Sequence, residues 1–281
     1  MDRASRLVGD AMADRLGKPM KYVNRAGASG EIALRMFLAT EDDGYTIFSG
    51  NLPTLMLGFG SKPQDYDFNE KVSWLGAYLR DPAILATSSK SPYKSAADFV
   101  ADATSRQVRV GVANWSSVQT LALLQLAEAT GAQLEIIPYS GFKKAATAML
   151  GGHIEAAVGN LAAIEKLGEN ARSLGIFEDE APAGTDHVPL ETALGIPVLN
   201  AASIRALAVH ESLKTSHPER YKLLLDAYGA TIADPAFAES FTKIQAEPSQ
   251  KISWSEAAVD KAGDRILKTL NDYRTLFEQG K

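Results

Sequence analysis

The sequence predicts an α/β fold built on a doubly wound parallel sheet, and three features of the chain carry this prediction. In the middle of the chain, short apolar runs alternate with helix-length segments, which is the rhythm of parallel βαβ units. The loops between these segments are only a few residues long. Beyond about residue 210 the pattern changes to helices alone, which fits a tail that returns to cover the first half of the chain.

The N-terminal part of the 281-residue chain is predicted to hold two strands between helices. Leu7, Val8, Met12 and Leu16 follow three-to-four-residue spacing, so residues 3–17 are expected to form an amphipathic helix that ends at Gly17. The elements expected after it are a strand over 20–23, a helix over about 31–39, a strand over 45–48 and a helix that starts over 52–57.

The middle of the chain carries the most regular alternation. The elements expected there are strands over 108–112, 134–138, 155–158 and 171–177, and helices over 116–130, 142–150 and 161–167. A further strand over 204–209 precedes helices over about 217–229, 234–245 and 255–278. A block with its own βαβ rhythm predicts a domain of its own.

The composition excludes several classes of protein. The net charge of −5 and the lack of a basic run argue against a nucleic-acid-binding protein. There is no cysteine, which excludes disulfides, cysteine-ligated zinc and thiol catalysis. No window of about 18 apolar residues exists to span a membrane, and Met1–Ser5 lacks the apolar region of a signal peptide. Taken alone, these features predict a cytoplasmic protein or a chain whose beginning is absent.

Catalytic and metal-binding patterns are poor. There is no G-x-S-x-G, no H-E-x-x-H and no His/Asp cluster with metal spacing, so we expect no catalytic residue, no metal and no cofactor. The four histidines are isolated in the sequence and are expected at the surface or in turns: His153, His187, His210 and His217. An enzyme assembled from residues distant in the sequence stays open as an alternative.

The turn Gly27–Gly30 leads into a helix, where free backbone N–H groups and the helix dipole favour an anion. It is no P-loop, because no Lys or Thr follows the glycines. Glu31 at the start of the helix would repel an incoming anion. We therefore interpret the turn as a tight strand-to-helix joint rather than an anion site.

Three successive strand-to-helix loops of the middle block are better candidates for a ligand site. They contain Asn114, Trp115, Ser116 and Ser117; Tyr139, Ser140 and Gly141; and Gly159 and Asn160. Ser116 or Ser117 suits a helix N-cap, and two hydroxyls near free N–H groups suit a carboxylate. Open α/β sheets bind ligands at the carboxyl ends of their strands, so the loops together predict the site. A plain capping role stays open for each, and Lys143 and Lys144 are interpreted as solvated.

Motifs along nearly the whole chain, in order, resemble those of one family. Gly17–Pro19, Asn24–Gly30 and Asp43–Thr46 resemble G-x-P, ENRPGAGG and PDGYT. Further resemblances are Pro138–Gly141 to PYKG, Leu150–Glu155 to LLGGQVD, Gly159–Leu161 to DNLP, and Val188–Leu190 with Leu194–Gly195 to VPTxxELG. These are motifs of the substrate-binding proteins of tripartite tricarboxylate transporters, the TctC or Bug family.

The resemblance implies a type II periplasmic-binding-protein fold, in which two doubly wound lobes close over a small organic acid without chemistry. Lobe 1 would comprise 1–82 and 203–281, and lobe 2 would comprise 83–202, with a hinge near 81–87 and 199–205. The protein would be periplasmic and would deliver a di-, tri- or aromatic carboxylate to membrane permease subunits. The alternatives are a receptor of the same fold that presents its ligand to a sensor protein and, less favoured, an enzyme.

The resemblance also assigns residues to the site. Asn114–Ser117 falls where the family holds a ligand carboxylate, and Ser49, Gly50 and Asn51 fall on a ligand loop of the first lobe. Of the family's opening ligand loop only Asp2 could remain, so we expect the first strand and the signal peptide to be missing.

Two departures from the family bear on the ligand. Gly159 stands where Asp is common, which removes a partner for a ligand amine. Trp115 stands in place of a small residue, which suggests a narrower pocket or an aromatic ring stacked on the ligand. Asn51, which is expected to follow a strand and to face the cleft, is the first residue to mutate.

Overall fold

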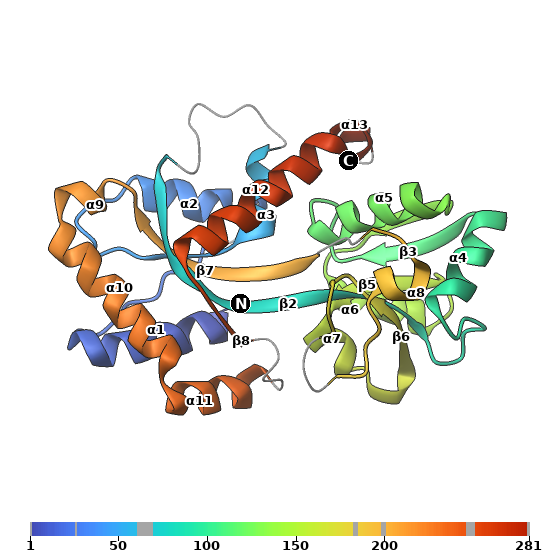
Figure 1. Cartoon of the computed structure of the whole chain (residues 1–281), viewed down its shortest axis with the longest axis horizontal. Coiled ribbons are helices and arrows are strands. Elements are labelled where there is room, and N and C mark those ends of the chain that lie inside the picture. The colour runs from blue at the N-terminus through green and yellow to red at the C-terminus, as the bar shows by residue number, and fades with distance from the viewer. Residues whose placement is uncertain are drawn as a thin grey trace. The chain divides into compact units, whose positions relative to one another are not determined.

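The chain divides into two compact units in the computed structural model, which describes residues 2–25, 27–60, 70–181, 185–197, 201–245 and 251–279. Unit 1 comprises Met1–Arg80 and Ile204–Lys268, and unit 2 comprises Asp81–Ser203 and Thr269–Lys281. Each boundary falls inside an element, so the strands β2 (Val72–Ser88) and β7 (Ala202–His210) and the helix α12 (Glu256–Asp272) each belong to both units (Figure 1).

The two lobes expected from the sequence stay a prediction. The compact units differ from them mainly at the C-terminus, because Thr269–Lys281 groups with unit 2, whereas the prediction placed the whole C-terminal tail in lobe 1.

Unit 1 contains a sheet whose strands differ in their bounds from those expected from the sequence. Strand β1 (Phe48–Asn51) pairs antiparallel with β7, with Phe48 opposite Ala208 and Asn51 opposite Arg205. Strand β7 lies next to β2, and β8 (Lys251–Trp254) pairs antiparallel with β2. The strand expected over 20–23 is wrong, since this segment has no strand structure and its residues Lys21 and Val23 are exposed. The strand expected over 45–48 begins only at Phe48, because Tyr45 is 76% exposed and stacks under Arg220.

The helices of unit 1 follow the expected order. They are α1 (Asp2–Leu16), α2 (Glu31–Leu38), α3 (Leu52–Gly60), α9 (Leu213–Ser216), α10 (Pro218–Ala233), α11 (Pro235–Gln245) and α12. The short 3₁₀ turn Ala28–Gly30 directly precedes α2. Helix α1 contacts α10 and α11. Val8 and Met12 of α1 share one buried cluster with Tyr78 of β2 and Phe241 of α11, so burial of the predicted apolar stripe holds α1 in place.

Unit 2 is built on a mixed sheet with the strand order β4-β3-β5-β2-β6. Its strands besides β2 are β3 (Val108–Val112), β4 (Leu134–Pro138), β5 (Ala156–Asn160) and β6 (Ala171–Ile176). Strands β4, β3 and β5 are parallel, but β2 runs antiparallel to both β5 and β6. The α/β fold is confirmed, and the all-parallel sheet expected for this block is wrong, because β2 was not foreseen as a strand.

Helices cover both faces of this sheet, as a doubly wound fold requires. One face packs on α4 (Ala96–Ser105), α5 (Val118–Thr130) and α8 (Leu190–Leu194), and the other face packs on α6 (Phe142–Leu150) and α7 (Leu161–Glu165). A 3₁₀ turn over Gly168–Asn170 precedes β6, and α13 (Arg274–Gln279) completes the unit. Helix α4, which the sequence analysis missed, begins with a capping box of Ser95 and Asp98.

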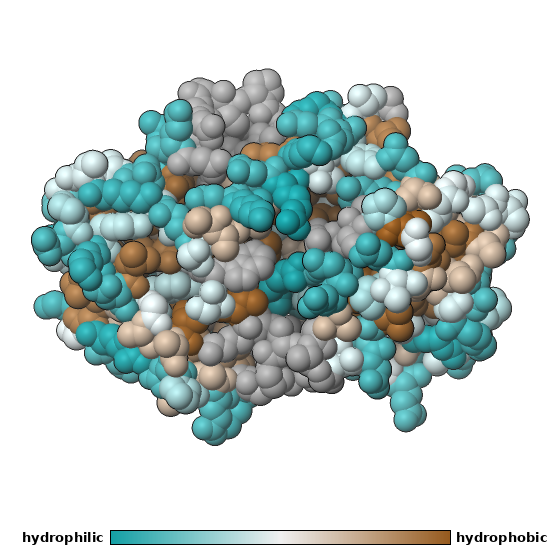
Figure 2. Space-filling view, in the orientation of Figure 1, coloured by the Kyte–Doolittle hydropathy of each residue, from teal (hydrophilic) through white to brown (hydrophobic). Residues whose placement is uncertain are grey.

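Hydrophilic and hydrophobic residues are interspersed on the face seen in Figure 2. The large hydrophobic side chains that remain exposed are spread over several elements: Val23, Ile32, Met36, Tyr45, Val188, Leu223, Leu225 and Leu276. Among the residues described, no helix combines the length and the apolarity needed to cross a bilayer.

Candidate functional site

Three predicted loops of unit 2 lie at one edge of its sheet. Because β4, β3 and β5 are parallel, their carboxyl ends point to the same side, and each strand leads directly into a helix there. Asn114–Ser117 joins β3 to α5, Tyr139–Gly141 joins β4 to α6, and Gly159 and Asn160 end β5 before α7. The structure therefore brings together the unit 2 residues that the sequence proposed, and their hydrogen bonds distinguish their roles.

In the first loop, Ser117 is fully used by the protein. Its hydroxyl is the N-cap of α5, accepting from the Thr120 backbone N–H at 3.3 Å, and it donates to the Asn114 carbonyl at 3.0 Å. Ser116 is half-buried and Asn114 is exposed. The capping role predicted for one of the two serines is thus taken by Ser117.

Trp115 in the same loop turns towards the C-terminal helix. Its indole N–H donates to the Phe277 carbonyl at 2.6 Å, and the two rings lie 6.1 Å apart. Sequence reasoning had expected this ring to narrow the pocket or to stack on a ligand. Its packing partner in the structure is Phe277, a residue that lies too far along the chain to be foreseen.

The second loop lies beside a positive charge on α6. Its backbone is tied to the first loop, since Tyr139 N–H donates to Val112 and Gly141 N–H donates to the Ala113 carbonyl, both at 2.9 Å. Helix α6 begins after Gly141 without any side-chain cap. The Lys144 ammonium, one turn into the helix, donates to the Ser140 hydroxyl at 2.7 Å. An uncapped helix N-terminus beside an ammonium group favours an anion.

The third loop is closed by a carboxylate of the protein itself. Asp81 on β2 is 8% exposed, and its Oδ1 accepts from the Ala162 N–H at the start of α7 at 3.3 Å. Asn160 donates from Nδ2 to the Asp81 carbonyl at 3.2 Å and accepts from Gln119 Nε2 at 2.7 Å. Asn160 therefore holds the edge of the sheet together.

Sequence reasoning missed Asp81 and Gln119. Asp81 had a detectable signal, because Arg80 and Asp81 interrupt a long apolar run, and an Asp inside a buried strand needs a hydrogen-bond partner. Gln119 had none, since its partner Asn160 lies 41 residues away.

Gly159 makes room for an aromatic ring. A Cβ atom added there would lie 2.3 Å from the Phe142 ring. The space that an Asp would need at this position is filled by Phe142, so the departure noted from the family signature has a packing cause.

In unit 1, Ser49, Gly50 and Asn51 are residues of strand β1 itself and not of a loop that follows a strand. They pair with β7, and Asn51 directly precedes α3. The loop expected there is wrong, because β1 starts three residues later than predicted. Asp2 is the first residue of α1, and its side chain lies outside the described part of the chain.

These unit 1 residues are surrounded by hydroxyl groups. Ser49 Oγ lies 2.9 Å from Ser5 Oγ, and Ser5 Oγ lies 2.8 Å from the Tyr78 hydroxyl. Asn51 Nδ2 donates to Thr54 at 3.0 Å, whereas Asn51 Oδ1 is buried and has no hydrogen-bond partner among the described atoms. An acceptor of this kind suits a hydroxyl or another donor group of a ligand.

The turn Gly27–Gly30 is a joint, although no strand precedes it. Gly27, Ala28 and Gly30 all have positive φ, and a Cβ on Gly30 would lie 2.9 Å from Leu55 of α3. Its glycines are needed for a left-handed backbone and for close packing of α3. This favours the interpretation of the turn as a joint rather than as an anion site.

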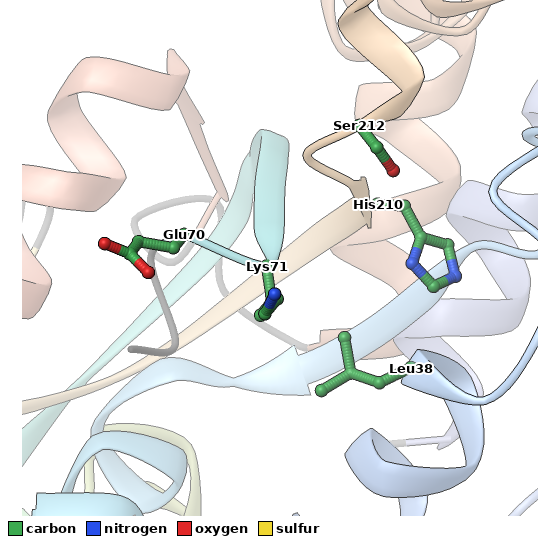
Figure 3. Close-up of a pocket in the computed structure, with 5 residues that line it drawn as sticks. All are labelled: Leu38, Glu70, Lys71, His210 and Ser212. Carbon is green, nitrogen blue, oxygen red and sulfur yellow. The ribbon is translucent and has the colours of Figure 1, made fainter. Parts of the chain in front are cut away.

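A separate cavity of about 350 Å³ lies in unit 1, lined by Leu38, Glu70, Lys71, His210 and Ser212 (Figure 3). Arg205 faces Asn51 across the β1–β7 ladder, so His210 lies about 17 Å further along β7 at the usual strand rise. The lining mixes a carboxylate with an ammonium group, which gives no net attraction for an acid.

His210 itself is part of the packing of this region. It stacks on Phe37 at 4.3 Å and lies 3.2 Å from Thr40 Oγ1. Burial lowers its pKa, and the nearby Asp42 and Asp43 oppose this effect. The expectation that every histidine lies at the surface is therefore wrong for His210, which is 8% exposed.

A sequence model of the TctC family, described as "Tripartite tricarboxylate transporter family receptor", matches residues 4–261. The chain belongs to this family. The resemblance noted in its motifs is thereby confirmed, and the chain is a solute-binding protein of the TctC type, a class whose members are periplasmic binding proteins.

Curated relatives cover most of the chain. Protein BugT of Bordetella pertussis is 28% identical over 253 residues, which are 88% of this chain and 77% of BugT. A protein of Cupriavidus necator described as "UPF0065 protein in gbd 5'region" is 26% identical over 272 residues, which are 94% of this chain and 82% of that protein.

Solved structures share the fold. A TctC solute-binding protein from Polaromonas has a TM-score of 0.78 at 21% identity, covering 96% of this chain and 92% of its own. Rpa4515 of R. palustris with adipate has a TM-score of 0.77 at 19% identity, with coverage of 99% and 92%. MatC from Rhodopseudomonas palustris with bound malate has a TM-score of 0.75 at 18% identity, with coverage of 96% and 93%. At these identities the likeness establishes the TctC-type fold of the chain.

Proposed function

We propose that this TctC-family protein captures a small organic carboxylate in the periplasm and delivers it to the membrane subunits of a tripartite transporter. The observation that carries the proposal is the open N-terminus of α6. Its backbone N–H groups have no side-chain cap, and Lys144 and Ser140 lie beside them. An anion bound there would gain the helix dipole, an ammonium group and a hydroxyl together.

The residues proposed to contact the acid in unit 2 are Ser116, Tyr139, Ser140, Gly141 and Lys144. Ser117 and Asn160 act behind them, because their polar groups are engaged in capping α5 and in the Asp81 network. In unit 1 the proposed contacts are Ser49, Gly50 and Asn51, with the buried Asn51 Oδ1 as an acceptor for a ligand donor.

The ligand class follows from these groups. Relatives of the same fold have been solved with adipate and with malate, both aliphatic dicarboxylates. Trp115, which was expected to narrow the pocket or to stack on the ligand, is engaged by Phe277. We therefore place aliphatic di- and hydroxydicarboxylates first, ahead of tricarboxylates and aromatic acids. A ligand amine is disfavoured, because Phe142 fills the space beside Gly159.

A thermal-shift screen followed by calorimetry tests this proposal. The acids are malate, adipate, citrate and benzoate, with glucose, putrescine and sodium chloride at equal ionic strength as controls. A ligand present at 100 times its Kd stabilises a protein by about 2.7 kcal/mol, so a bound acid is expected to raise the melting temperature. Stabilisation by glucose or putrescine, with no response to any acid, would contradict the carboxylate assignment.

A further inference from the structure

The side chain of Trp115 links the first ligand loop of unit 2 to the C-terminal helix. We propose that α13 positions the loop Asn114–Ser117 for ligand binding, and that Trp115 and Phe277 are the positioning residues through which it does so. This inference rests on the proposed function, since it assigns a role in ligand affinity to a contact outside the ligand groups themselves.

The contact between α13 and α5 is held at two places. Phe277 is fully buried, its carbonyl accepts the Trp115 indole N–H at 2.6 Å, and the rings lie 6.1 Å apart with their planes tilted by 36°. The Tyr273 hydroxyl donates to the carboxylate of Glu128 in the last turn of α5. Figure 1 shows α13 beside α5 in unit 2. Phe277 of α13 is thus attached to the loop before α5, and Tyr273, the residue that precedes α13, is attached near the end of α5.

Trp115 is fixed through its backbone as well as its ring. Its carbonyl accepts from the Ser117 N–H at 2.8 Å, in the turn that brings Ser117 to its capping position. Ser116 lies between these two fixed residues. An indole held by α13 therefore restricts the direction in which the Ser116 hydroxyl and N–H can point, which is preorganisation of a ligand group.

Trp115 stands where the family signature has small residues. Its bulk has a packing cause in this structure, because its indole N–H and its ring are both engaged by Phe277 of α13. The ring therefore supports the loop instead of stacking on a ligand.

The test uses the full chain and a matched pair of substitutions on α13. Phe277→Ala removes the buried ring, and Leu276→Ala removes a neighbouring side chain that is 51% exposed. Trp115→Phe keeps an aromatic ring and removes the indole donor. Amide hydrogen exchange of the ligand-free protein is measured over residues 113–120 and over β3 and β4, and the Kd of malate and adipate is measured by calorimetry.

We expect Phe277→Ala to speed exchange over 113–120 without changing β3 and β4, and to weaken acid binding about tenfold by releasing side chains that were preordered. Trp115→Phe is expected to produce a smaller change in the same direction, and Leu276→Ala is expected to match the wild type. If Phe277→Ala behaves like Leu276→Ala in both measurements, the inference is overturned.

The outcomes separate this inference from the proposed function. If the wild type binds neither acid, the proposed function fails, and the exchange of the ligand-free loop still decides whether α13 holds it. If Phe277→Ala does not fold, Trp115→Phe decides, and wild-type exchange over 113–120 in that variant would overturn the inference.

Discussion

Helices α6 and α7 begin at the same edge of the unit 2 sheet, yet their N-termini are satisfied in opposite ways. Helix α7 receives the carboxylate of Asp81, which accepts from Ala162 N–H at 3.3 Å. Helix α6 has Gly141 at its N-cap, no side-chain cap, and the Lys144 ammonium one turn away. One end thus already holds an anion from the protein, and the other end has an ammonium group and a hydroxyl beside its backbone N–H groups.

This difference teaches where a ligand acid can be bound. A helix N-terminus favours an anion only while its N–H groups are unoccupied. Sequence patterns alone made the loops after β3, β4 and β5 equivalent candidates, whereas their hydrogen bonds differ. Helix α5 is capped by Ser117 and α7 receives Asp81, but α6 has no side-chain cap.

The largest effect is expected from Asp81→Ala, which removes the carboxylate that closes the N-terminus of α7. The substitution removes an acceptor of a helix N–H and leaves buried polar groups unpaired, so we expect it to lower the free energy of unfolding by about 3 kcal/mol. Urea denaturation measures this loss. Asp81→Asn keeps one oxygen acceptor and should lose less than half as much. A loss of acid binding without any loss of stability would instead make Asp81 a ligand residue.

A smaller loss is expected from Gly159→Ala, which tests how tightly the closed end is packed. The added methyl would lie 2.3 Å from the Phe142 ring, and overpacking of this kind costs about 2 kcal/mol. The double variant with Phe142→Leu should recover part of that loss, as a double-mutant cycle in urea would reveal. Gly229→Ala on α10 is the control, because nothing lies within 4 Å of its added Cβ.

The strands of unit 2 that alternate with helices were predicted from the sequence almost residue by residue, whereas β2 was missed. Strand β2 is buried on both faces along nearly its whole length, so it shows no alternation of polar and apolar residues, and Pro82 stands within it. The opposite error was made at residues 20–23, where Val23 is 56% exposed. A local pattern of β-forming residues does not form a strand when there is no neighbouring strand to pair with.

The loops of the candidate site were predicted from the sequence, but the long-range contacts between its residues were not. Ser117 as a cap and the edge formed by the parallel strands follow from local signals. The contacts of Asp81 with Asn160 and of Trp115 with Phe277 join residues 79 and 162 positions apart. Such pairs depend on the tertiary fold, so one sequence without that fold does not reveal them.

The open end is tested by Lys144→Gln against Lys143→Gln. Both substitutions remove one positive charge from α6, but only Lys144 donates to Ser140. We expect Lys144→Gln to weaken binding of malate or adipate about tenfold, equivalent to about 1.4 kcal/mol. We expect Lys143→Gln to change it by less than about twofold, because the bond to Ser140 that holds the ammonium beside the loop is made by Lys144. Equal effects of the two variants in calorimetry would mean that α6 attracts the acid only through general charge.

The smallest expected effect is the contribution of His210 to the pH dependence of stability. This contribution determines the pH at which variants at the two helix ends are best compared. Burial lowers the pKa of His210 in the folded protein, so below its unfolded pKa of about 6.5 the unfolded chain binds a proton that the folded chain does not. This stability is present in full above that pH and is lost as the pH falls below it. Burial lowers the pKa of His187 in the same direction.

We therefore expect the wild type to lose stability from pH 7 to pH 5.5 in urea titrations, and His210→Gln to lose less over the same range. The share of His187 should remain in both proteins. Identical slopes for the wild type and His210→Gln would mean that His210 binds its proton equally well in both states. Because the slope vanishes above the unfolded histidine pKa, the stability changes at Asp81 and Gly159 are best measured near pH 8, where the difference between the closed and the open helix end is free of this contribution.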